Sequence, residues 1–108
     1  MTWKESIPEV TNGEFEEFTK DRLAFIDFFA EWCMPCTMMS PIIEDLSEEF
    51  GNKIKFGKVN VDDNQKIAQK FEITSIPTFV LIKNSEILER ISGTVTQDEL
   101  EEILKKHL

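Results

Sequence analysis

The 108-residue sequence predicts an α/β fold built around a mixed sheet. Short apolar runs of strand length alternate with segments in which apolar residues recur at helical spacing, which indicates parallel strands joined by helices. The last two apolar runs are separated by only two residues, which indicates an antiparallel hairpin in the same sheet. The length fits a single domain over residues 1–108.

The N-terminal part is expected to contain a short strand and a short helix. Residues 7–10 are predicted as a strand that Pro8 interrupts, because proline has no N–H to donate to a ladder. A Thr-Asn-Gly-Glu capping box begins at Thr11 and precedes two phenylalanines at helical spacing. These residues predict a helix over 12–20.

The central part predicts a strand, a long helix and a second strand. Residues 23–30 are a near-continuous apolar run, as expected for a central strand covered on both faces. An amphipathic helix should follow from near Cys33 to Gly51, with Pro41 kinking it. Residues 54–61 form the next predicted strand, parallel to the first through a right-handed crossover.

The C-terminal part predicts a helix, a hairpin and a last helix. The Asp-Asp-Asn cluster at 62–64 should cap the first of these helices. Strands are expected over 78–83 and 86–91, joined by a two-residue Asn-Ser turn. A second capping box, Thr-Gln-Asp-Glu at 96–99, should begin the last helix.

The composition excludes some classes of partner. There are 21 acidic residues against 12 basic ones, a formal net charge of -9. This charge argues against nucleic acid and anionic membranes as partners. The first residues lack the apolar region of a secretory signal, and no apolar run is as long as a membrane span. We therefore expect a cytoplasmic location, where thiols are mostly reduced and a close cysteine pair is catalytic or metal-binding rather than structural.

Cys33 and Cys36 are the only cysteines, and four kinds of site compete for them. Structural zinc needs four ligands, and the only histidine, His107, is far away in the sequence. An iron–sulfur cluster also usually needs four cysteines. A structural disulfide across so short a loop would remove little chain entropy. Redox catalysis is the favoured interpretation, and neither a metal nor another cofactor is expected.

The placement of the pair supports redox chemistry. Cys33 is expected at the carboxyl end of a strand and the N-terminus of a helix, where backbone N–H groups stabilise a thiolate. Cys36 lies one helical turn later, and we expect it to be more shielded and able to attack a mixed disulfide on Cys33. Pro35 suits the first turn of the helix and stiffens the loop.

Several segments resemble the thioredoxin family. "AEWCMPC" resembles its active-site segment, which typically reads Trp-Cys-Gly-Pro-Cys, so this chain would be a Trp-Cys-Met-Pro-Cys variant. Further resemblances follow in the same order, namely "IDFFAEWC", Pro41, "KVNVDDN", "SIPTFVLIKNSE" and "GTVTQDEL". The resemblance covers about residues 20–107. It implies a thioredoxin fold with a five-stranded mixed sheet flanked by four helices.

The resemblance also implies an activity and partners. The protein would be a dithiol–disulfide oxidoreductase that reduces protein disulfides through a Cys33–Cys36 disulfide, and a separate thioredoxin reductase would recycle it. We expect a monomer. Two alternatives stay open at this point. One is a thiol oxidant or isomerase of the same fold, and the other is a non-enzymatic binding module whose dithiol is incidental.

Two charged residues acquire catalytic roles through the resemblance. Asp27 lies within "FIDFF", where burial should raise its pKa and favour the neutral form. The resemblance makes Asp27 the proton partner of Cys36. The resemblance also places Lys58 near Asp27, where it would tune this carboxyl group.

Six residues are expected to bind the substrate. The resemblance implies a shield beside the cysteines at Trp32, a cis peptide bond between Ile76 and Pro77, and a hydrophobic rim at Gly93. A cis-proline would leave the Ile76 main chain free to pair with an extended target. The complete expected surface is Trp32, Met34, Pro35, Ile76, Pro77 and Gly93.

Three positions depart from the family pattern. Met34 replaces a glycine between the cysteines, which bears on redox potential and target choice. Phe29 stands where many members have tryptophan, and Ser85 replaces the hairpin glycine. Met38 and Met39 are expected to serve in core and helix-surface packing rather than as redox sensors.

Overall fold

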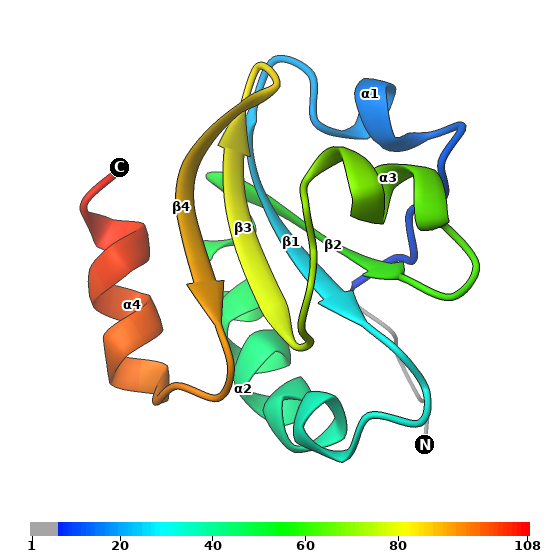
Figure 1. Ribbon diagram of the computed structural model, residues 1–108. Helices are drawn as coiled ribbons and strands as arrows, with labels where there is room; N and C mark the ends of the chain where they lie inside the picture. Colours follow the sequence, from blue (N-terminus) through cyan, green and yellow to red (C-terminus); the bar gives the residue numbers. More distant parts are fainter. Residues whose placement is uncertain (1–6) are drawn as a thin grey trace, which may run out of the picture.

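A four-stranded mixed sheet with the strand order β2-β1-β3-β4 is the centre of the computed structural model, which describes residues 7–108 (Figure 1). The elements in chain order are α1 (Phe15–Phe18), β1 (Leu23–Phe29), α2 (Met34–Phe50), β2 (Ile54–Asn60), α3 (Gln65–Lys70), β3 (Thr78–Lys83), β4 (Glu86–Ser92) and α4 (Gln97–Lys105). Over these described residues, no helix combines the length and apolar character that crossing a membrane requires.

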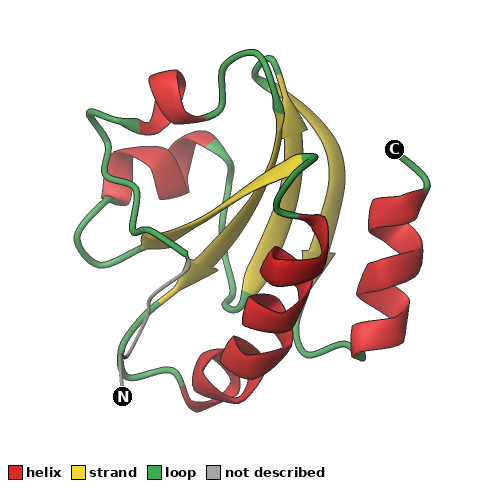
Figure 2. Cartoon of the chain, turned by 180° about the vertical axis from the view of Figure 1, so that it is seen from behind, coloured by secondary structure: helices red, strands yellow, loops and turns green. Residues whose placement is uncertain are grey.

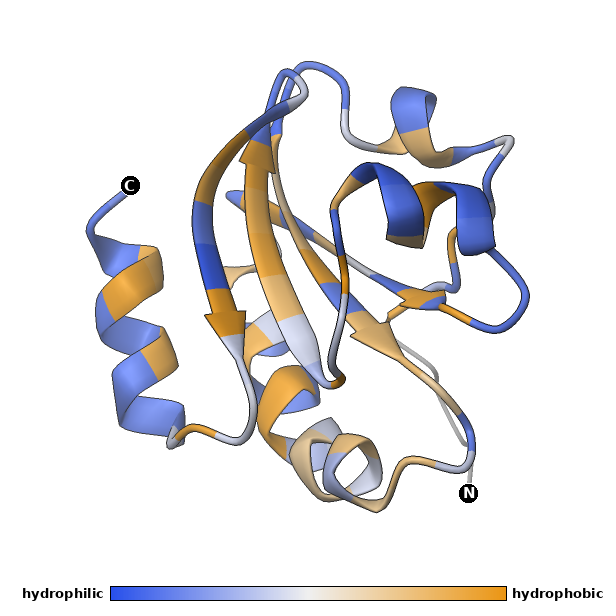
Figure 3. Cartoon of the chain, viewed as in Figure 1, coloured by the Kyte–Doolittle hydropathy of each residue, from blue (hydrophilic) through white to orange (hydrophobic). Residues whose placement is uncertain are grey.

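Helices cover both faces of the sheet, so the predicted α/β class is confirmed. Figure 2 shows α2 and α4 on one face and α1 and α3 on the other. The core is accordingly divided in two by alternating side chains of the central strand, with Phe25 in one cluster and Ile26 and Phe28 in the other. Figure 3 shows the hydrophobic character of β1 and β3 between these layers.

The central strand β1 lies between a parallel and an antiparallel neighbour. It pairs in parallel with β2, as the predicted crossover requires, and antiparallel with β3. Every residue of β1 except Phe29 is buried, as the apolar run indicated. The register sets Asp27 beside Lys58 on β2, which brings together the two charged residues singled out in the sequence.

The predicted fifth strand is wrong for the described residues. Residues 7–10 contribute only an isolated bridge between Glu9 and Lys58. The Lys58 N–H donates to the Pro8 carbonyl at 3.0 Å, and the Val10 N–H donates to the Lys58 carbonyl at 2.8 Å. Because Pro8 has no N–H, it cannot extend this pair of bonds into a longer ladder.

The first predicted helix is shorter than the expected 12–20. Only half of its capping box forms: the Glu14 carboxylate accepts from both the N–H and the hydroxyl of Thr11 at 3.0 Å. The Glu14 N–H donates to the Thr11 carbonyl instead of the hydroxyl, so a turn precedes the helix, which begins at Phe15. The second box, at 96–99, is complete and begins α4 as predicted.

The long helix α2 has the predicted position. Cys33 is its N-cap, Pro35 lies in its first turn and Gly51 is its C-cap. Pro41 lies inside the helix, where it cannot donate to the Thr37 carbonyl. The N-cap position fixes the direction of the first backbone N–H groups relative to the Cys33 sulfur.

The hairpin between β3 and β4 has the predicted two-residue turn. Asn84 and Ser85 have φ angles of 52° and 71°, the left-handed conformation of this turn type. The Asn84 side chain accepts a hydrogen bond from the Asp21 N–H at 3.2 Å, whereas no hydrogen bond of the Ser85 side chain occurs within residues 7–108. Ser85 therefore has a left-handed backbone conformation, and no hydrogen bond of its side chain offsets the strain of that conformation.

Ser85→Gly should stabilise the protein. A left-handed conformation costs a non-glycine residue about 1–2 kcal/mol. Replacing the residue by glycine removes this strain, but glycine loses more conformational entropy on folding, which reduces the gain. We expect a gain of about 0.5–1 kcal/mol in the free energy of unfolding, measured by urea denaturation. Ser85→Ala is the matched control, because alanine keeps the strain. Equal stabilities of the glycine and alanine variants would contradict this account.

Candidate active site

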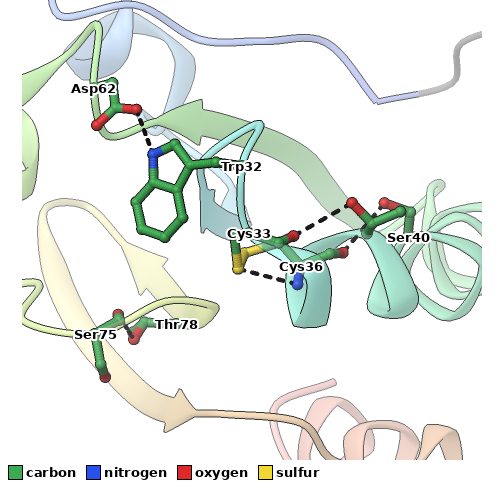
Figure 4. The surroundings of a disulfide bond; sticks show 8 residues. Trp32, Cys33, Cys36, Ser40, Asp62, Ser75 and Thr78 are labelled. Carbon is green, nitrogen blue, oxygen red and sulfur yellow. Dashed lines mark hydrogen bonds between the residues drawn. A yellow bond between two sulfur atoms is a disulfide. The ribbon is translucent and has the colours of Figure 1, made fainter.

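The loop after β1 carries the two cysteines to the start of α2. Cys33 and Cys36 form a disulfide, with their Cα atoms 5.3 Å apart (Figure 4). The Cys36 N–H donates to the Cys33 sulfur at 3.2 Å. This bond is the N-cap interaction of α2, so the first turn of the helix directs a backbone donor at the Cys33 sulfur. Such a donor favours a negative charge on that sulfur.

The two cysteines are equally buried in the disulfide form. Their exposed fractions are 4% for Cys33 and 5% for Cys36, so the expectation that Cys36 is more shielded is wrong for this state. They form a small apolar cluster with Ala30, against which Ile76 packs. The two cysteines differ in their surroundings, because Cys36 lines a partly open cavity that also reaches the buried Asp27, and Cys33 does not line it.

This cavity of about 230 Å³ is lined by Cys36 and by the two charged residues of the sheet. Asp27 and Lys58 line it from β1 and β2, and Cys36, Thr37 and Ser40 line it from α2. The sequence analysis predicted the first three as a group, and the structure brings them to one cavity. It missed the two hydroxyl residues, although Ser40 lies one helical turn after Cys36 and therefore on the same face.

Asp27 is a buried carboxyl group in this cavity. Its exposed fraction is 7%, and its Oδ1 atom has no hydrogen-bond partner within residues 7–108. Burial raises the pKa of Asp27 from 3.8 to about 7, and the positive charge of Lys58 opposes part of this rise. A carboxyl group with this pKa can accept and return a proton near neutral pH. The Lys58 ammonium itself lies 5.4 Å from the centre of the Phe29 ring.

The segment before β3 lies beside the cysteines. The Ile76–Pro77 peptide bond is cis, as the resemblance implied. The Pro77 carbonyl accepts a hydrogen bond from the Gly93 N–H at 2.8 Å, and Gly93 has a φ of 87° that favours glycine. Within residues 7–108, no hydrogen bond uses the main chain of Ile76. The N–H and C=O groups of Ile76 are therefore unpaired within the described residues.

Trp32 and Met34 are exposed beside the disulfide. The Trp32 indole N–H donates to the Asp62 carboxylate at 2.8 Å, which holds the ring in place (Figure 4). The sequence analysis read Asp62 only as part of a helix cap, and spacing alone does not reveal this contact. A groove of about 350 Å³ lies between Trp32 and the segment at 73–76, including Ile76. Met34 and Gly93 do not line this groove.

The relationship to known proteins agrees with this geometry. The sequence model of the thioredoxin family matches residues 6–106. The chain belongs to the thioredoxin family. It is 38% identical to the thioredoxin of Bacillus subtilis (strain 168) over 103 residues, covering 95% of this chain and 99% of the relative. Identity is 37% to the thioredoxin of Listeria monocytogenes over 102 residues, covering 94% of this chain and 99% of the relative.

A third thioredoxin, from Buchnera aphidicola, is 40% identical over 104 residues, covering 94% of this chain and 96% of the relative. The resemblance in the sequence is thereby confirmed. As a member of the thioredoxin family with a Cys33–Cys36 pair at disulfide distance, the protein is a dithiol–disulfide oxidoreductase that reduces protein disulfides. Its substrates are disulfide-containing proteins, and a reductase restores its dithiol.

Met34→Gly tests the departure from the family pattern within this site. Met34 is the first residue of α2 and its exposed fraction is 69%, so its removal should cost about 1 kcal/mol of stability or less. Glycine adds backbone freedom between the cysteines and removes an apolar group, so the redox potential, the target preference or both should change. Thiol–disulfide equilibration and turnover with several protein targets measure these properties.

Met34→Leu is the matched control for this experiment, because it keeps an apolar side chain of similar size. A change in Met34→Gly but not in Met34→Leu assigns the effect to the loss of the side chain. Identical potentials and turnover in all three proteins would show that methionine is merely tolerated at this position.

Proposed function

We propose that Cys33 is the attacking thiol and Cys36 the resolving thiol in the reduction of target disulfides. The Cys33 thiolate attacks one sulfur of the target disulfide, forms a mixed disulfide and displaces the other target sulfur as a thiolate. The Cys36 thiolate then attacks Cys33, which releases the second target thiol and forms the Cys33–Cys36 disulfide. The observation that carries this order is the backbone N–H at the start of α2, which donates to the Cys33 sulfur.

Asp27 is the proposed proton acceptor for Cys36. The two residues line the same cavity, and a pKa of about 7 allows the Asp27 carboxyl group to exchange a proton near neutral pH. Thr37 and Ser40 line the same cavity, and their hydroxyl groups donate to the carbonyls of Cys33 and Cys36 at 3.3 and 3.4 Å. Burial raises the pKa of Asp27 and the charge of Lys58 opposes part of this rise, so the two together set the pH at which the acceptor is available.

Target recognition is assigned to the surface around the disulfide. The free main chain of Ile76 would pair with an extended segment of the target, and the cis bond to Pro77 sets its direction. The exposed side chains of Trp32 and Met34 would add apolar contacts. Pro35 and Gly93 complete the binding surface of the proposal.

The proposed oligomeric state, location and electron source are those of a small cytoplasmic reductant. A single domain over 1–108 works as a monomer in the cytoplasm and receives its two electrons from a thioredoxin reductase. Both cysteines of the sequence are used in the redox pair, so no thiol is left for a further structural disulfide. The net charge of -9 disfavours nucleic acid and anionic membranes as partners.

Equilibration against a series of thiol–disulfide buffers tests the direction of the reaction. A reductant should have a potential near that of thioredoxins, about -270 mV, whereas a thiol oxidant would lie near about -120 mV. The fraction oxidised is read by alkylation and mass spectrometry. A potential at the oxidising end would contradict the proposed direction. Full support of a partner's function by a variant without either cysteine would instead indicate a binding module.

A further inference from the structure

Two methionines of α2 are exposed next to the disulfide. Met34 and Met38 each have an exposed fraction of 69%, whereas the neighbouring Met39 has 3% and lies in the core. Met39 therefore occupies the core and Met38 the helix surface, the two kinds of position expected from the sequence. Met34 and Met38 are four positions apart on one helix, so their side chains are neighbours on its surface.

This methionine pair continues the surface proposed to bind targets. Met34 follows Cys33 in the sequence, and Trp32 precedes Cys33 and has an exposed fraction of 71%. No charged residue occurs from 32 to 43, although 31% of the chain is charged. A partner that covers residues 32–43 would therefore desolvate no charged side chain of that stretch, and the Asp62 carboxylate beside Trp32 already accepts the indole N–H. If the proposed function holds, the partner that covers this methionine surface is an apolar part of the disulfide-bearing target.

We propose that Met34 and Met38 are oxidation sites through which peroxide weakens target docking. The peroxide transfers one oxygen atom to the thioether sulfur, the O–O bond breaks, the sulfur loses two electrons and water leaves. The product, methionine sulfoxide, is polar where the thioether was apolar, and such a change disrupts methionine-rich interfaces. In the disulfide form the cysteines have no thiolate to react, so the methionines are modified first.

The modification is tested on the disulfide form of the protein. Hydrogen peroxide is added in small excess and removed with catalase, and peptide mass spectrometry follows the sulfoxide content of each methionine over time. Met34 and Met38 should be oxidised several-fold faster than Met39, which serves as the buried control in the same helix. Oxidation of Met39 at the same rate as the other two would overturn the assignment.

The effect on docking is tested by turnover, with dithiothreitol as the reductant. Peroxide treatment should lower kcat/KM for the reduction of insulin by about threefold to tenfold, as loss of apolar contacts in an interface predicts. Reduction of hydroxyethyl disulfide, which is too small to cover the methionines, should be unchanged. Equal loss with both substrates would overturn the docking effect, because it would indicate damage to the cysteine pair.

Variants locate the effect, each compared with itself before and after peroxide. The double variant Met34→Leu, Met38→Leu should lose its sensitivity, whereas Met39→Leu should keep it. A double variant as sensitive as the unaltered protein would contradict the proposal. If the untreated protein does not reduce insulin at all, that result contradicts the proposed function rather than the oxidation inference. Unchanged insulin reduction by a protein with both sulfoxides would contradict this inference alone.

Discussion

Cys36→Ser should accumulate target proteins as stable mixed disulfides on Cys33, whereas Cys33→Ser should accumulate almost none. This result is expected because the first variant keeps the attacking thiol and lacks the group that resolves the intermediate. Both variants should lose turnover. Nonreducing electrophoresis followed by mass spectrometry of the trapped species identifies the cysteine that carries the target.

Limited alkylation provides an independent test of the same assignment. The reduced protein, treated with less than one equivalent of iodoacetamide, should be labelled first at Cys33, because the backbone N–H at the start of α2 points at its sulfur and favours the reactive thiolate. The variant with both cysteines replaced is the control for labelling elsewhere. Preferential labelling of Cys36, or equal trapping by the two single variants, would reverse or remove the proposed order of attack.

Asp27→Asn should make the protein more stable at neutral pH and slower in releasing its targets. The folded pKa of Asp27, about 7, lies above its ordinary value of 3.8, so the folded state retains a proton that the unfolded state loses. The stability of the native protein is therefore unaffected by this group below about pH 4, falls as the pH rises toward 7 and reaches its minimum above that. The difference of about 3 pKa units corresponds to about 4 kcal/mol.

Asparagine removes the charge of Asp27 and keeps the shape of the side chain, so the variant regains part of the stability that ionisation of Asp27 costs. We expect a gain of about 2–4 kcal/mol at pH 8 and a much smaller gain at pH 5, measured by urea denaturation. Asp45→Asn, on the exposed side of α2, is the matched control and should change neither value appreciably. Asp27→Ala tests the same point without the polar amide.

The kinetic half of this prediction concerns Cys36. Without a proton acceptor in the cavity, Cys36 is deprotonated more slowly, so the mixed disulfide should persist longer in single-turnover experiments near neutral pH. Higher stability together with slower release is the pattern of a group retained for function at the expense of folding. A variant that is less stable at both pH values and releases its target normally would make Asp27 a structural residue.

The sequence alone was informative where local chemistry determines structure. The apolar run around Asp27 predicted the central strand and the burial of this carboxyl group. The amphipathic pattern that follows this run predicted that Cys33 and Cys36 lie at the start of a helix. The complete capping box at 96–99 likewise began a helix at the expected position. Each of these features depends on residues close together in the sequence.

Features that depend on distant residues were predicted less well. The cis bond before Pro77 followed only from the family resemblance, because most such bonds are trans. Whether residues 7–10 form a strand depends on how far their pairing with β2 can extend past Pro8. In the structure this pairing is a single bridge. The contact of Trp32 with Asp62 joins two loops and leaves no periodic pattern.

The position of β1 has a consequence for the speed of exchange with targets. This strand is paired on both edges and covered on both faces, so it belongs to the part of the molecule that opens least often. The reactive pair follows it after a short loop and is therefore held by a preorganised backbone. The conformational entropy of ordering the site is lost during folding and is not lost again at each encounter. Collision with a suitably exposed disulfide then needs little rearrangement of the protein, so the conformational cost of exchange should fall mainly on the target, which must expose its disulfide.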